Sequence, residues 1–193
     1  MLYPMITPPF KFDSFETLTK KEAQTLFDWY ISCIPERVAL LEECFNDVWR
    51  CCVKFDYNLS SLDPLWECYE KHIEIERKSE KQIRAENKGF PEHVINELLK
   101  DNRDLSKGTY IIALDIAMYY GETLARNLPG IHWGFFDKPK SALSVNKAVL
   151  LGFENKQYLD PTIIVLNCTR RSMDNLNPKE LSQVTDVWRK YLP

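Results

Sequence analysis

Three polar side chains that could take part in chemistry recur along one predicted helix. Asp115, Tyr119 and Glu122 follow one another at positions i, i+4 and i+7, which places them on one face of an α-helix. Two carboxylates can serve as general acid and general base when their surroundings separate their pKa values. At a rise of ~1.5 Å per residue the two acids lie about 10 Å apart along the helix axis. That spacing alone does not exclude acid–base chemistry.

Two acids on one helix are nevertheless a weak signal for catalysis, and a structural role is the leading interpretation. In that case at least one carboxylate is largely buried and has a basic or backbone hydrogen-bond donor, because an unpaired buried charge costs several kcal/mol. If the face is instead a recognition surface, its binding residues are Asp115, Tyr119, Glu122 and Trp133. Both acids should then line an open groove near Trp133.

Other catalytic or cofactor-binding patterns are missing from the sequence. It contains no G-x-S-x-G, no H-E-x-x-H and no glycine cluster that could hold phosphates. No two cysteines have zinc-finger spacing, and the histidines lie apart at positions 72, 93 and 132. We therefore expect no cofactor and no metal. The six cysteines are expected to be small buried apolar residues in a reducing compartment: Cys33, Cys44, Cys51, Cys52, Cys68 and Cys168.

The helix that carries the acids is predicted to be the central element of the fold. It is apolar nearly all the way round, and its small residues recur every fourth position on the side opposite the acids. Such a ridge allows another element to approach closely. The ridge comprises Ala113, Ala117, Gly121 and Ala125. We expect it to be buried against another helix or against the sheet.

Capping signals and hydrophobic periodicity place the remaining elements. Helices are predicted at 20–33, 36–55, 64–87 and 107–127, with a short helix after Pro91 and a last helix from residue 178. Short apolar runs at 131–136, 147–153 and 162–167 predict three strands. Residues 1–18 are rich in proline and phenylalanine and are expected to form an extended arm that packs its aromatic rings on the body.

These elements predict one α+β domain spanning residues 1–193. Its N-terminal two-thirds is helical and surrounds the central helix, a small antiparallel three-stranded sheet follows, and a C-terminal helix closes the chain. A strand before residue 100, or a parallel sheet, would contradict this prediction.

Composition limits the classes of function. The chain has 193 residues, of which 45% are hydrophobic and 27% charged, and its net charge is −3. This balance is ordinary for a globular protein and predicts no nucleic-acid partner. The longest apolar run, 110–120, is interrupted by Asp115 and is too short to span a bilayer. No secretory signal is visible at the first residues, so we expect a cytoplasmic location without membrane contact.

Two segments resemble an uncharacterised group of small proteins from Gram-positive bacteria. The first runs from Leu18-Thr-Lys-Lys-Glu-Ala23 through Phe27-Asp-Trp-Tyr30 to Ile34-Pro-Glu-Arg37. The second is Asp115-Ile-Ala-Met-Tyr-Tyr-Gly-Glu122, followed by Trp133 and by Gly152-Phe153. Similar D-x-x-x-Y-x-G-E…W patterns occur in bacterial proteins of the immunity type, which bind and silence a toxin domain. The resemblance implies binding to a toxin-like protein partner and supplies no catalytic residue.

Two functional hypotheses follow. The first is a cytoplasmic protein-binding module, specifically an immunity-type inhibitor of a toxin domain. The alternative is a hydrolase or transferase of unfamiliar type that works through Asp115 and Glu122. The missing nucleophile–base pattern favours the first.

Overall fold

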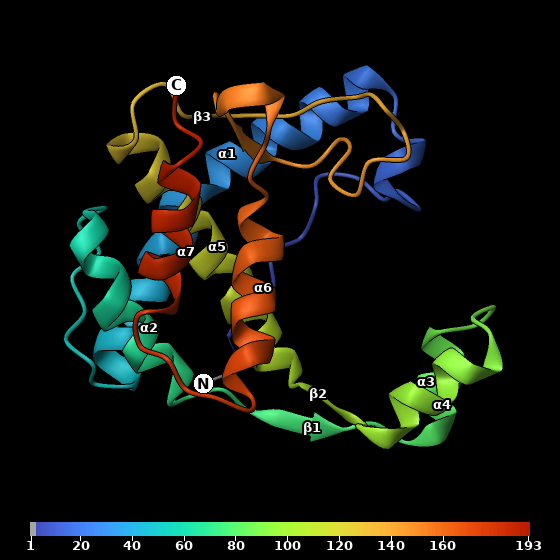
Figure 1. The fold of residues 1–193 in the computed structure, drawn as a ribbon. Coiled ribbons are helices and arrows are strands. Elements are labelled where there is room, and N and C mark those ends of the chain that lie inside the picture. The colour runs from blue at the N-terminus through green and yellow to red at the C-terminus, as the bar shows by residue number, and fades with distance from the viewer. Residues whose placement is uncertain (1–2) are drawn as a thin grey trace.

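The computed structural model describes residues 3–193 and has an α+β architecture (Figure 1). Residues 1 and 2 of the predicted N-terminal arm lie outside the described residues. The α-helices are α1 (Lys20–Glu43), α2 (Leu62–Glu70), α3 (Glu80–Glu86), α4 (Glu92–Lys100), α5 (Lys107–Asn127), α6 (Pro161–Ser172) and α7 (Glu180–Arg189). The strands are β1 (Ile75–Arg77), β2 (Arg103–Leu105), β3 (His132–Gly134) and β4 (Val149–Leu151).

Helix α5 lies at the centre of the fold, and its bounds agree with the prediction (Figure 1). It begins after Ser106, whose side chain caps the first turn by accepting a hydrogen bond from the backbone N–H of Thr109. Helices α1 and α6 pack on α5, and α7 packs on α2. Within residues 3–193, no helix combines the length and the apolar character that crossing a membrane requires.

The prediction of two helices separated at Pro35 is wrong, because α1 continues through this residue to Glu43. Proline removes one backbone N–H from the helix. Pro35 is exposed, so solvent can satisfy the carbonyl that loses its partner. Buried residues on both sides, such as Leu26 and Val38, favour one continuous helix. A π-helical turn at Cys44–Val48 follows α1 directly. The helical segment therefore ends at Val48 rather than at the predicted residue 55.

The predicted helix 64–87 is also wrong. Helix α2 ends at Glu70, and β1 follows at Ile75–Arg77, which is a strand before residue 100. The charged segment after α2 has no apolar face that would hold a long helix on the body. Lys78 pairs with Glu86 and with Asp104 of β2, contacts that a continuous helix through this segment would not bring together.

Residues 74–106 form a projection that stands away from the body (Figure 1). Strands β1 and β2 form its stem as an antiparallel pair in which Ile75 faces Leu105 and Arg77 faces Arg103. Helices α3 and α4 pack on each other at the far end. The short helix predicted after Pro91 is confirmed as α4.

The second sheet contains two strands, β3 and β4, rather than three. The antiparallel pairing is confirmed, with Trp133 opposite Leu150. The third predicted strand, 162–167, lies inside helix α6. Asp160 caps this helix by accepting hydrogen bonds from the N–H groups of Thr162 and Ile163, and Pro161 occupies its first turn. The capping signal therefore outweighs the β-branched residues that suggested a strand.

The C-terminal helix and the N-terminal arm agree with the prediction more closely than the middle of the chain does. Helix α7 begins at Glu180, two residues after the expected start. In the N-terminal arm (residues 3–18), the aromatic rings pack on a small apolar cluster of the body, as predicted. The contacting rings are Phe10, Phe12 and Phe15, and the cluster is Leu18, Ala23 and Leu26.

Candidate functional site

Asp115 is fully buried and forms a two-point ion pair with α1. Its carboxylate accepts hydrogen bonds from Nε of Arg37 at 2.9 Å and from Nη2 of Arg37 at 2.6 Å. The hydroxyl of Tyr3 donates to the same carboxylate, and Nη2 of Arg37 also donates to the carbonyl of Pro4 at 2.7 Å. The acid therefore joins α5, α1 and the N-terminal arm.

These contacts confirm the structural prediction for at least one acid. Burial raises the pKa of the Asp115 carboxyl, while the hydrogen bonds from Arg37 and Tyr3 act in the opposite direction. Burial and the neighbouring Asp115 also raise the pKa of Tyr3. A fully enclosed carboxylate with these partners cannot reach a ligand unless the N-terminal arm moves.

Tyr119 is also buried, but its partners lie in the loop that precedes α2. Its hydroxyl accepts a hydrogen bond from the N–H of Tyr57 at 3.1 Å and shares another with the hydroxyl of Ser61 at 2.6 Å. The ring of Phe55 packs edge-on against that of Tyr119. Tyr119 therefore fixes the course of this loop over α5.

Glu122 and Trp133 meet at the other end of α5. The indole N–H of Trp133 donates to Glu122 at 3.0 Å, and Nε of Arg126 donates to the second carboxylate oxygen at 2.7 Å. The indole lies directly over Gly121, where an added Cβ would stand 2.3 Å from the ring. Ala113 and Ala117 are fully buried as well, so the predicted burial of the ridge is confirmed at these three residues.

The four residues proposed from the sequence therefore do not converge on one opening. Asp115 faces α1, Tyr119 faces the loop before α2, and Glu122 bonds to Trp133 on β3. Each side chain already has its partners within the fold. Asp115, Tyr119 and Glu122 therefore hold neighbouring elements against α5. They do not form a binding surface together.

The Glu122–Trp133 contact leads to a prediction of modest size. Glu122→Gln keeps the shape of the side chain but removes the charge that faces Arg126. Because Arg126 is half exposed, we expect the free energy of unfolding to fall by about 0.5–1.5 kcal/mol. Denaturant titration of the variant beside the wild-type protein measures this loss, and an unchanged midpoint would contradict the role given to Glu122.

A cleft of about 650 Å³ opens between the N-terminal arm, the end of α1 and the first turn of α5. Its walls carry both apolar and ionisable side chains, including Tyr3, Trp49, Lys71, His72, Thr109 and Ile112. Trp49 and His72 stack face to face, with ring centroids 4.2 Å apart and planes 6° from parallel. The cleft therefore has an aromatic and imidazole wall next to the buried Asp115 network.

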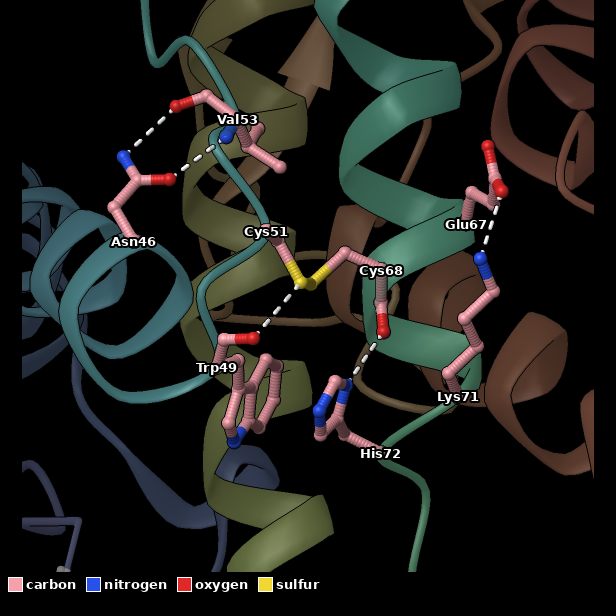
Figure 2. Close-up of a disulfide and its surroundings, with 8 residues drawn as sticks. All are labelled: Asn46, Trp49, Cys51, Val53, Glu67, Cys68, Lys71 and His72. Carbon is pink, nitrogen blue, oxygen red and sulfur yellow. Dashed lines mark hydrogen bonds and ion pairs between the residues drawn. A yellow bond between two sulfur atoms is a disulfide. The ribbon is translucent and has the colours of Figure 1, made fainter.

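Behind this wall the structure contains a disulfide between Cys51 and Cys68, which corrects the expectation that all six cysteines are free (Figure 2). The two Cα atoms lie 6.0 Å apart, a separation that suits a disulfide. The other four cysteines are free, and of these Cys44 and Cys168 are buried as expected, whereas Cys33 is only partly buried and Cys52 is exposed.

The fold also places His72 beside this cysteine pair. One potential ligand atom from each of Cys51, Cys68 and His72 lies within 4.8 Å of the other two. The cluster contradicts the expectation of no metal-ligand group, which depended on the missing zinc-finger spacing and on the scattered histidines, because Cys51 and Cys68 lie 17 residues apart in sequence. One signal is present in the sequence: Cys68 and His72 are four residues apart, and in the structure His72 lies in the turn just after α2, with Nδ1 2.8 Å from the Cys68 carbonyl oxygen.

The projection presents the other notable surface. Phe90, in the turn between α3 and α4, is 57% exposed, and Leu98 on α4 is 38% exposed. Charged side chains of the projection pair largely with one another, for example Arg84 with Glu80 and Glu92. Among the salt bridges of the described residues, one connects the projection to the body. It joins Arg103 of β2 to Asp174, in the segment after α6.

Comparisons with models of known protein families, with curated proteins and with solved structures each find no match for this chain. The proposed function therefore depends on the geometry of the chain's own residues and, for the class of partner, on the motif resemblance in the sequence.

Proposed function

We propose that this chain is a protein-binding module and that the projection is its contact element. The observation that carries this proposal is the exposure of Phe90 and Leu98 on an element that stands away from the body (Figure 1). Large exposed apolar side chains on a surface surrounded by polar groups are typical of interaction sites. Aromatic side chains that enter a partner's pocket commonly supply most of the binding energy.

The charge pattern supports a protein partner. Lys78, Arg84 and Arg103 are each bonded to acids of the projection, so they are not free to hold phosphate groups. A partner with an apolar pocket bordered by polar groups would match this surface. The resemblance to immunity-type proteins supports a toxin-like domain as that partner. In this proposal the Asp115…Trp133 motif supplies the framework, and the projection supplies the contacts.

The enzyme alternative receives less support from the contacts. Asp115 is fully buried and bonded to Arg37 and Tyr3, while Glu122 bonds to Trp133 and Arg126. Acid–base catalysis requires carboxylates that can reach one substrate. The two acids are directed to different neighbours.

The proposal predicts that two polar substitutions abolish binding without unfolding the protein. The double variant Phe90→Asp/Leu98→Asp places a charge at both of these exposed apolar positions of the projection. Affinity purification of the tagged chain from the organism that encodes it should recover a partner with the wild-type protein and lose it with the variant. We expect the affinity for that partner to fall at least 100-fold, since a hot-spot residue contributes about 2 kcal/mol or more and two are replaced.

The matched control is Leu143→Asp, which changes another exposed leucine, 69% exposed, outside the projection. This variant should retain the partner, and circular dichroism should show all variants to be folded. Loss of the partner with Leu143→Asp, or its retention with the double variant, would contradict the proposal. If the recovered partner is a toxin domain, co-expression with the wild-type chain should restore growth and co-expression with the double variant should not.

A further inference from the structure

We propose that, when the Cys51–Cys68 disulfide is reduced, Cys51, Cys68 and His72 form a binding site for Zn²⁺. The observation is the convergence of two sulfur atoms and one imidazole nitrogen within 4.8 Å. Two thiolates and one imidazole, with water as a fourth ligand, are a known ligand set for tetrahedral zinc. This inference does not depend on the protein-binding proposal, because the ligands lie outside the projection.

Contacts other than the disulfide hold the loop that carries Cys51 (Figure 2). The side chain of Asn46 accepts a hydrogen bond from the N–H of Val53 at 2.7 Å and donates one to its carbonyl at 2.9 Å. The N–H of Cys51 also donates to the carbonyl of Phe45 at 3.0 Å. We therefore expect Cys51 to remain near Cys68 after the sulfur–sulfur bond is broken.

His72 is held by two contacts of its own. Nδ1 lies 2.8 Å from the carbonyl oxygen of Cys68, and the ring stacks on Trp49 (Figure 2). Because a carbonyl oxygen accepts, Nδ1 carries the proton in the neutral ring and Nε2 keeps a free lone pair. This arrangement is common among histidines that bind metals. A half-turn of the imidazole about its Cβ–Cγ bond leaves the ring in the plane that stacks on Trp49.

Formation of the zinc site from the disulfide requires a thiol reductant as the co-reactant. A thiol reductant supplies two electrons and two protons, so the sulfur–sulfur bond breaks, two thiols form and the reductant becomes a disulfide. Zn²⁺ then displaces both thiol protons to solvent and binds the two thiolates and the neutral imidazole. With Zn–S bonds of ≈ 2.3 Å the sulfurs need to stand about 3.8 Å apart, which side-chain rotation can supply. A small-molecule disulfide can accept two electrons from the pair by thiol–disulfide exchange, so that the Cys51–Cys68 bond forms again and the metal is released.

The test uses Co²⁺, which occupies tetrahedral zinc sites and is visible by absorption. The purified chain is reduced with a thiol, desalted without oxygen and titrated with Co²⁺. We expect one Co²⁺ per chain, a thiolate-to-cobalt charge-transfer band, and displacement of the cobalt by Zn²⁺. The oxidised chain should show none of these. His72→Gln, which keeps both cysteines, should weaken binding at least ~10-fold, because even second-shell changes weaken metal sites by this factor.

The matched control is Cys52→Ser, which removes the exposed free thiol next to Cys51 and should leave the titration unchanged. Cys68→Ser should remove most of the charge-transfer band, with circular dichroism confirming that each variant is folded. The proposal is overturned if the reduced chain binds no more cobalt than the oxidised chain. It is also overturned if His72→Gln binds cobalt as tightly as the wild-type protein, or if Cys52→Ser abolishes binding.

Discussion

Replacing Asp115 by asparagine is expected to lower the free energy of unfolding by about 3–5 kcal/mol, because it leaves a buried guanidinium without its counter-charge. Arg37 is only 6% exposed, and Asp115 is its carboxylate partner in the structure. Tyr3 also loses a charged acceptor, which loosens the N-terminal arm. Denaturant unfolding measures the loss directly. Limited proteolysis within residues 3–18 should show whether the arm is released.

A control and a double variant separate this effect from a general loss of charge. Asp186→Asn breaks an exposed ion pair with Arg189 and should change the free energy of unfolding by less than about 1 kcal/mol. Arg37→Leu/Asp115→Leu removes both buried charges and should recover part of the loss, since isolated buried charges cost more than apolar replacements. A loss below 1 kcal/mol for Asp115→Asn would contradict the structural role of this acid.

The second large effect is expected at Gly121. Any side chain there meets the indole of Trp133, with the first added atom 2.3 Å from the ring and 3.0 Å from Pro161. Gly121→Leu should therefore lower the free energy of unfolding by at least about 1–3 kcal/mol through overpacking. The displaced indole should also lose its hydrogen bond to Glu122 and its edge contact with Tyr30. A change in tryptophan near-ultraviolet circular dichroism should accompany the loss.

The matched substitution is Gly108→Leu in the first turn of the same helix. An added Cβ at Gly108 would meet only the hydroxyl of Ser106, at 3.8 Å. Leucine favours helix by up to about 1 kcal/mol over glycine, so this variant should be neutral or more stable. If Gly121→Leu melts together with Gly108→Leu, the close contact with Trp133 does not exist in solution.

Local signals located some elements well. The capping box of Thr19 and Glu22 marks the start of α1 and is present in the structure. Two equally local signals mark helix starts that are absent from the predicted elements. Ser79 and Gln82 form a capping box that starts α3 inside the supposed long helix, and Asp160-Pro161 starts α6 where a strand was predicted. At both positions the capping residues determine the local structure more strongly than the apolar periodicity does.

Other features depend on contacts between residues distant in sequence. The Arg37–Asp115 pair spans 78 residues, so the sequence could indicate that a donor exists but not which residue supplies it. The proximity of Cys51 to Cys68 depends on the π-helical turn and the loop after α1. The projection arises because the segment after α2 forms β1 and pairs with β2. This pairing depends on residues distant in sequence and not on local propensity.

The most direct test of the proposed function is photo-crosslinking from the projection. A photoreactive phenylalanine analogue placed at position 90 should join the chain to one partner protein in its native cells, and untagged wild-type chain should compete this product away. The same analogue at position 143, which is exposed outside the projection, should give no such product. Absence of a specific product from position 90, or an equal yield from position 143, would contradict binding through the projection.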